Sequence, residues 1–252
     1  MLSLSKTAAA LAVILPLAFA GTAPTCTNPQ LSCSGSSTNT CCFNTPGGLF
    51  QQVQFWDTDP VTGPDTSWTI HGLWPNNCDG TYSENCDKTR AYTNITQLLT
   101  AAGQTSTLSY MKSYWLSDDE SDEAFWDHEW ETHGTCISTL KPSCYTGYTP
   151  GEEAVDFFVK VVSLFKTLPT YTWLANAGIT PSSSKTYSLS AMNSALEKAF
   201  GAPVILLCDS STVYEIYYAF DVMGSLQSGT FVPATNTGSK TNCPSTVKYP
   251  PK

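Results

Sequence analysis

The sequence predicts an α+β fold with disulfides, and three observations support that prediction. Helical patterns gather in the middle of the chain, whereas strand patterns lie on both sides of them. No regular alternation of strand and helix recurs, and the chain has no internal repeat, heptad pattern or glycine-rich phosphate loop. The ten cysteines are even in number, which indicates five disulfides if the chain folds in an oxidising compartment.

The first twenty residues are typical of a secretory signal peptide. A short segment with Lys6 leads into an apolar run over residues 8–20, which ends Ala-Phe-Ala before Gly21. The run is too short to span a membrane. We therefore expect a signal peptide over residues 1–20 and a secreted, extracellular protein. The remaining residues, 21–252, are enough for one sizeable core, so we expect a single domain there.

Four segments show strand patterns. In the first, LFQQVQFW, alternation places Leu49, Val53 and Phe55 on one face. Gln54 then faces the other way, either as a polar residue at the edge of the core or as a residue of a site. The second strand is closed by Pro75. The expected strands are residues 49–56, 68–73, 203–208 and 213–220.

Four segments show helical patterns. An acidic turn over residues 118–123 favours the start of one helix through the helix dipole, and Gly134 ends that helix. The longest helix opens at Pro150 and carries an apolar stripe that we assign to the core. Ser190 can cap a shorter helix that Gly201 ends. The expected helices are residues 107–116, 123–132, 150–168 and 191–200.

The remaining segments predict loops. Residues 21–48 are rich in Thr, Ser, Asn, Gly and Pro and hold four cysteines, which indicates a loop region tied down by disulfides. Residues 57–65 and 76–90 are connectors, and the tail from Gly224 is rich in Gly, Ser and Pro. Asn94 begins an Asn-Ile-Thr acceptor for N-glycosylation, which is either a glycosylated surface position or an unused acceptor.

Charge and cysteine spacing narrow the classes of function. The formal net charge is −9, and an acidic chain gains little from non-specific attraction to phosphate. This counts against a DNA-binding or RNA-packaging protein, but it allows a nuclease with a local site that works at low pH. No cysteine pair has the C-x-x-C spacing of a structural zinc site. Adjacent Cys41 and Cys42 are expected to bond to different partners, because a disulfide between neighbours is strained.

All three histidines lie in two short aromatic segments, WTIHGLWP (residues 68–75) and FWDHEWETHGTC (residues 125–136). Histidine is the commonest general acid or base near neutral pH. The alternative is that the histidines are packed core residues, but their confinement to two motifs favours chemistry. Trp68, Trp126 and Trp130 are assigned to the core.

The spacing in the second segment favours chemistry without a metal. Glu129 and His133 are four residues apart and share a helix face. His128 and His133 are five apart, about 140° around an ideal helix, so they converge only if His133 lies in a frayed last turn. The spacing is one residue longer than that of the zinc proteases, which disfavours a zinc hydrolase. Cleavage of RNA by its own 2′-hydroxyl needs a base, an acid and a group that steadies charge on phosphorus, which these residue types supply.

The two segments closely resemble the active-site segments of the ribonuclease T2 family of secreted endoribonucleases, W-x-I-H-G-L-W-P and H-E-W-x-x-H-G-x-C. The signal peptide, ten cysteines and length resemble the fungal branch of secreted acid endoribonucleases. The resemblance covers nearly all of residues 21–252. It implies an α+β domain with a central, mainly antiparallel sheet flanked by helices. It also implies cleavage of single-stranded RNA with low base specificity and without a cofactor or metal.

The resemblance also assigns roles to matching residues. His133 resembles the general base that activates the 2′-hydroxyl, and His71 resembles the general acid that protonates the departing 5′ oxygen. The two exchange roles when the 2′,3′-cyclic phosphate is hydrolysed to a 3′-phosphate. His128 resembles the phosphate-binding histidine, and Glu129 resembles the carboxylate that supports the pentacovalent phosphorus.

Five further residues are candidates for base binding. Trp74 and Tyr82 match aromatic positions that stack on the upstream base, although both could be ordinary packing residues. Asn76 stands where some relatives carry an aspartate that reads purines, so base preference is expected to differ. Gln54 and Phe125 are candidates for the downstream base site.

The remaining expectations concern one residue that differs from the family pattern, the binding partners and the disulfides. Thr132 stands where the family often has lysine, and a neutral donor is weaker than a charged one. This leaves an alternative on the same fold, a slow or non-catalytic secreted binding or defence protein. We expect a monomer that binds single-stranded RNA but neither DNA nor a membrane. The disulfides that the resemblance implies are Cys26–Cys42, Cys33–Cys78, Cys41–Cys144, Cys86–Cys136 and Cys208–Cys243.

Overall fold

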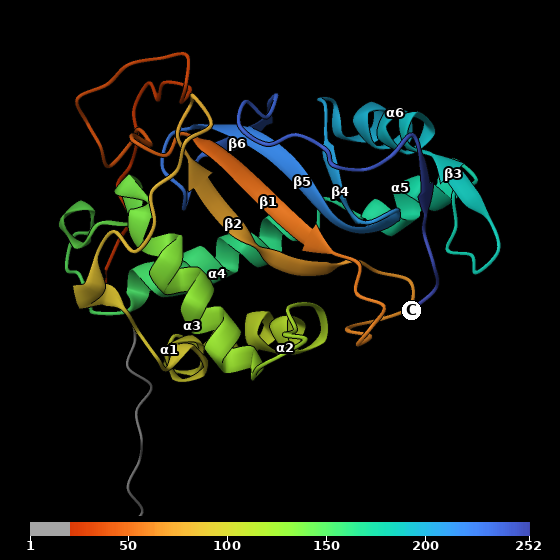
Figure 1. The fold of residues 1–252 in the computed structure, drawn as a ribbon. Helices are drawn as coiled ribbons and strands as arrows, with labels where there is room; N and C mark the ends of the chain where they lie inside the picture. The colour runs from red at the N-terminus through yellow and green to blue at the C-terminus, as the bar shows by residue number, and fades with distance from the viewer. Residues whose placement is uncertain (1–20) are drawn as a thin grey trace, which may run out of the picture.

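The computed structural model describes residues 21–252, and the expected signal peptide lies outside the described residues. A twisted sheet forms the middle of the molecule (Figure 1). Helix α4 packs against β1 and β2, α1 and α2 pack against α4, and α5 and α6 lie at the end of the sheet near β3 and β4. This is the predicted α+β class, with helices flanking a mainly antiparallel sheet.

Among the described residues the sheet has seven strands, and β5 is its longest. The path runs β2-β1-β5-β7-β3, with β4 and β6 also paired to β5. Every pairing is antiparallel except that of β5 with β7. The strands are β1 (Leu49–Phe55), β2 (Thr69–Asn76), β3 (Thr186–Ser188), β4 (Ile205–Asp209), β5 (Thr212–Met223), β6 (Thr230–Pro233) and β7 (Thr246–Lys248).

The α-helices include all four that were predicted and two that were not, α1 and α5. α4 is the longest, as predicted, and Gly151 precedes it with φ of 94°. Four short 3-10 turns lie at residues 88–90, 134–136, 138–140 and 142–144. The α-helices are α1 (Ile95–Ala101), α2 (Thr105–Tyr114), α3 (Asp122–Thr132), α4 (Glu152–Phe165), α5 (Thr170–Asn176) and α6 (Leu189–Phe200).

The core lies between the sheet and the helices. Phe50 of β1 and Leu73 of β2 belong to one apolar cluster with Phe157 and Phe158 of α4. Because side chains alternate along a strand, the other face of β1 and β2 is left for different contacts. That face carries the functional groups described below. The three tryptophans assigned to the core, Trp68, Trp126 and Trp130, are all buried.

Two expected helix signals differ from the structure. Ser188, not Ser190, caps α6, since its side chain accepts a hydrogen bond from the Ala191 amide at 3.4 Å. Gly201 ends that helix in the left-handed conformation (φ 96°), as predicted. Gly134 follows α3 but opens a 3-10 turn instead of forming a left-handed cap. A side chain at position 134 would overlap the Trp130 ring, so packing explains this glycine.

Ten cysteines form five disulfides, and the described chain has no free thiol. Adjacent Cys41 and Cys42 bond to different partners, as strain in a neighbouring pair requires. The five pairs are those that the family resemblance implies. They are Cys26–Cys42, Cys33–Cys78, Cys41–Cys144, Cys86–Cys136 and Cys208–Cys243.

Candidate active site

A β-bulge in the first two strands positions His71. Val53 pairs with Gly72 and Gln54 pairs with Ile70, so His71 is the extra residue of β2. Bulges commonly re-aim a side chain in this way. The His71 ring stacks on Phe55, with ring centroids 4.0 Å apart.

Two carboxylates face opposite nitrogens of His71. Nδ1 lies 2.6 Å from Oε1 of Glu215 on β5, and Nε2 lies 3.5 Å from Oε1 of Glu129. Glu215 is 4% exposed and Glu129 is fully buried. The His71 ring is therefore held at Nδ1 by Glu215 and has the Glu129 carboxyl group beside Nε2.

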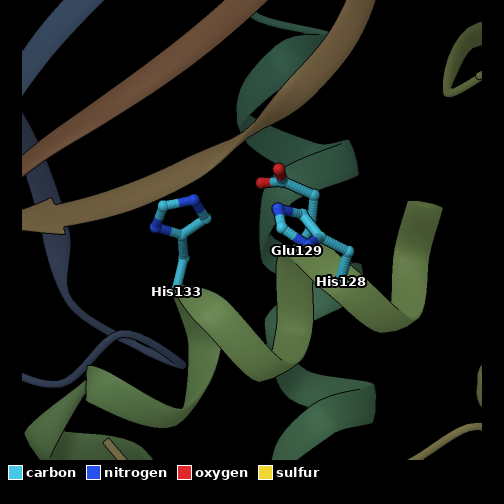
Figure 2. Close-up of side chains that lie close together, drawn as sticks. All are labelled: His128, Glu129 and His133. Carbon is cyan, nitrogen blue, oxygen red and sulfur yellow. The ribbon is translucent and has the colours of Figure 1, made fainter. Parts of the chain in front are cut away.

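Helix α3 supplies the other three functional groups, and they point to the same side (Figure 2). Ser121 caps the helix by accepting from the Ala124 amide at 3.2 Å. His133 is the C-cap residue that follows Thr132, with φ of −111° and ψ of −49°, so it leaves the regular helix. Its ring centroid then lies 6.4 Å from that of His128. The frayed last turn that convergence required is present.

The buried Glu129 carboxylate is held against β2. Its Oε2 accepts a hydrogen bond from Nε1 of Trp74 at 3.1 Å, and its Oε1 has no hydrogen-bond partner. A side chain at Gly72 would overlap this carboxylate, which explains the glycine between His71 and Leu73. Burial raises the pKa of Glu129 from 4.5 to about 7, against the lowering effects of His71 and of the Trp74 hydrogen bond.

His133 lies in the opposite electrostatic situation. Burial, together with the nearby His71 and His128, lowers the pKa of His133 from 6.5 to about 3. Its ring stacks on Trp74 with centroids 5.0 Å apart. The other side of the same indole meets His71 edge-on at 4.8 Å. Trp74 thus contacts both histidines and Glu129, and His133 stays a neutral base in acidic solution.

These residues line a cleft of about 460 Å³. Trp74, Asn76 and Tyr82 lie in it with the three histidines and Glu129, so the structure brings the upstream base candidates to the same cleft. Tyr82 is 65% exposed, which makes it available to a ligand.

The rim near Tyr82 is shaped by a compact turn. Asn77 accepts the Gly80 amide through its carbonyl, and Asp79 accepts from the backbone and hydroxyl of Thr81. Gly80 has φ of 86°, and its backbone packs directly on Gly238 of the tail, leaving no room for a side chain at either position.

The downstream base candidates, Gln54 and Phe125, are not among the residues that line this cleft. Gln54 is fully buried, its amide donates to the Leu168 carbonyl at 3.2 Å and its oxygen accepts from the Thr170 hydroxyl at 2.6 Å. It borders a separate cavity of about 90 Å³, so the interpretation as a core-edge residue fits its position. Phe125 is half-buried on α3, with its ring centroid 5.8 Å from that of His71.

Two site residues were missed by sequence reasoning. Glu215 and Tyr217 project from β5, a strand whose alternation was recognised although its polar member was not singled out. The available signal was a glutamate inside an otherwise apolar, alternating strand. Its partner is 144 residues away in the chain, which no local pattern reveals.

The structure also locates Thr132, which replaces the usual lysine, and Asn94, the glycosylation candidate. Thr132 is 7% exposed, and its hydroxyl lies 3.5 Å from Nδ1 of His128, so it contacts the phosphate-binding candidate. Asn94 is half-buried at the start of α1, and its side-chain amide donates to Gln97 at 3.4 Å.

A small cation could also fit beside α3. One ligand atom from each of His128, Glu129 and His133 lies within 4.8 Å of the others. The five-residue spacing therefore does not keep the two histidines apart, because His133 leaves the helix. Within residues 21–252 no fourth His, Cys, Asp or Glu joins this group.

The fold and cleft define a disulfide-bonded α+β protein whose site combines three histidines with a buried carboxyl group. Residues 47–237 match the ribonuclease T2 family. The chain is 58% identical to ribonuclease Trv of Hypocrea rufa, over 89% of this chain and 97% of that protein. It is 54% identical to ribonuclease Le2 of Lentinula edodes, over 90% and 96%.

Comparison with solved structures agrees. The crystal structure of Actibind, described as a T2 ribonuclease, superposes with a TM-score of 0.88 at 50% identity, covering 92% of this chain and 99% of that one. This chain belongs to the ribonuclease T2 family, and it is an endoribonuclease of that family. Within residues 21–252, no helix is both long and apolar enough to cross a membrane.

Proposed function

We propose that the protein is a secreted enzyme that cleaves single-stranded RNA by transphosphorylation, through a 2′,3′-cyclic phosphate to 3′-phosphate ends, with low base specificity. The observation that carries this proposal is the contrast between two histidines in one cleft. His133 is kept neutral by burial and neighbouring histidines, whereas His71 lies between the carboxyl groups of Glu129 and Glu215. One is suited to accept a proton and the other to donate one.

In the first step one histidine accepts a proton from the RNA and the other histidine donates one to it. The 2′-oxygen attacks phosphorus as His133 takes the 2′-hydroxyl proton. The bond from phosphorus to the 5′ oxygen breaks as His71 gives its proton to that oxygen. The product is a 2′,3′-cyclic phosphate and a free 5′-hydroxyl. In the second step water replaces the 5′-hydroxyl, His71 accepts the water proton, and His133 returns a proton to the 2′ oxygen.

Charge on phosphorus is met by the remaining groups. Below about pH 7 the buried Glu129 is protonated, so its carboxyl group can donate a hydrogen bond to a phosphoryl oxygen without repelling it. His128 is exposed at the mouth of the cleft and adds positive charge when protonated. The same reasoning favours activity in acidic solution.

The test uses a short single-stranded RNA and its all-deoxy counterpart, each digested at pH 5 with a chelator present, with products analysed by mass. We expect cleavage of RNA alone, and a 2′,3′-cyclic phosphate that precedes the 3′-phosphate. His71→Phe is the matched inactive control. Cleavage of both strands would overturn the 2′-hydroxyl mechanism. Loss of activity with chelator would favour metal chemistry, and no cleavage at any pH would favour the binding or defence protein.

Secretion is part of the proposal. The signal-like segment over residues 1–20 and the five disulfides support an oxidising route. Sequencing the amino terminus of protein recovered from culture medium tests it. The proposal expects a chain that begins at Gly21, and retention of the whole chain inside the cell would contradict it.

A further inference from the structure

Gln51 lines the cleft, and it takes no part in the proton transfers proposed for the histidines. It is on β1, paired in register with Trp74 of β2 and Ala219 of β5. Its side chain borders the cleft beside Trp74, Asn76 and Tyr217. Trp74 and Asn76 are two residues apart on β2, so all of these side chains lie on the same face of the sheet.

The Gln51 amide is buried and has no partner within the described chain. The residue is 1% exposed, and neither its nitrogen nor its oxygen makes a hydrogen bond. Its neighbours on β1 differ. The Gln52 amide donates to the Gly72 carbonyl at 3.2 Å, and Gln54 uses both of its polar atoms. A buried amide without partners is unfavourable and calls for a group that satisfies it.

We propose that Gln51 reads the edge of the base on the 5′ side of the cleaved bond, an inference that rests on the proposed ribonuclease function. A base edge presents hydrogen-bond donors and acceptors side by side. A glutamine amide presents one group of each kind, and rotation of its flexible side chain brings them toward a base held near Trp74 and Tyr82. Both polar atoms are then satisfied only when a base is bound.

The same chemistry accounts for low base specificity. An amide can turn over to exchange its donor and acceptor, so it can match the amine of adenine or cytosine and the carbonyl of guanine or uracil. Asn76 adds a second amide on the neighbouring strand. Two amides can thus pair with all four bases, whereas a carboxylate presents only acceptors and favours bases that carry an amino group.

The experiment measures kcat/KM for ApU, GpU, CpU and UpU with the wild type, Gln51→Leu and Gln51→Glu. With Gln51→Leu we expect the spread of the four values to change by fivefold or more. Gln51→Glu keeps the size of the side chain and presents mainly acceptors. We expect it to raise the ratios of ApU, CpU and GpU to UpU by about tenfold, because adenine, cytosine and guanine carry an exocyclic amino group and uracil does not. The UpA, UpG, UpC and UpU series, which varies the downstream base, should keep its ratios.

Gln52→Leu is the matched control, because it removes a buried glutamine from the same strand but from its opposite face. A structural loss should scale all four substrates together. Equal scaling by both Gln51 variants would overturn the inference, even with the wild type active. Failure of the wild type to cleave any dinucleotide or longer RNA would instead overturn the proposed function. If Gln51→Leu does not fold, Gln51→Glu and the inhibition constants of the four nucleoside 2′-monophosphates decide.

Discussion

Replacing Glu129 by glutamine should change how the stability of the protein depends on pH. The folded protein raises the pKa of this carboxyl group from 4.5 to about 7, because ionisation inside the protein removes the charge from water. Glutamine keeps the shape and can still accept the Trp74 hydrogen bond, but it cannot ionise. The substitution therefore isolates the cost of a buried charge.

The sign and size follow from linkage. A raised pKa contributes stability that is fully present below pH 4.5 and is lost as pH rises through about 7. The difference between the two pKa values corresponds to about 3 kcal/mol. The Glu129→Gln variant should therefore gain about 3 kcal/mol relative to wild type between pH 4 and pH 8. His133 has the opposite dependence, since its pKa is lowered, but wild type and variant share that effect.

The assay is urea unfolding at pH 4 and pH 8 with the disulfides intact. For a chain of this length the expected change corresponds to a relative rise in Tm of about 6–12 °C. Glu120→Gln, which alters an exposed carboxylate near the start of α3, controls for net charge. If the difference between Glu129→Gln and wild type is the same at both pH values, the buried charge is not what sets this dependence.

Three further predictions concern catalysis and stability. His71→Phe and His133→Phe should each lower kcat by at least about a thousandfold while far-UV circular dichroism stays unchanged, because each removes a proton-transfer group; near-wild-type turnover in either would remove its role. The pH profile of kcat/KM should peak below neutrality, since His133 stays neutral down to about pH 3 and Glu129 ionises near pH 7; a peak above neutrality would contradict this assignment. Replacing Cys208 and Cys243 by serine should cost about 3–4 kcal/mol of stability from the loop of 35 residues that they close, and a double variant as stable as wild type in urea would refute that magnitude.

Local patterns predicted the long elements and missed the short ones. The apolar stripe of α4 and the alternation of apolar residues in β1 predicted these two elements. The missed elements, α1, α5, β3, β6 and β7, span seven residues or fewer. Such segments depend on tertiary contacts more than on their own periodicity. The tail shows this, since β6 forms by pairing with β5 and β7 forms mainly by pairing with β3.

The site divides in the same way. The two histidine-containing motifs predicted His71, His128, Glu129 and His133 as site residues, because a family resemblance is recognised in short, contiguous sequence motifs. Glu215 could not be predicted from the sequence, because its place in the site depends on a contact between residues of β2 and β5. Gln54 was a candidate from its sequence position alone, and only the hydrogen bonds around it place it in the core. The burial that shifts the pKa of Glu129 is likewise a property of the assembled layers.

The contact between Gly80 and Gly238 joins two segments that are far apart in the chain, and a disulfide stands near each. Cys78 is tied to Cys33 on one side, and Cys243 is tied to Cys208 on the other. Reduction would open both disulfides, and this wall of the cleft would then be held by the glycine packing and by the hydrogen bond from the Thr237 hydroxyl to the Cys78 carbonyl. We therefore expect the reduced chain to hold this wall of the cleft less firmly and to cleave RNA more slowly than the oxidised chain.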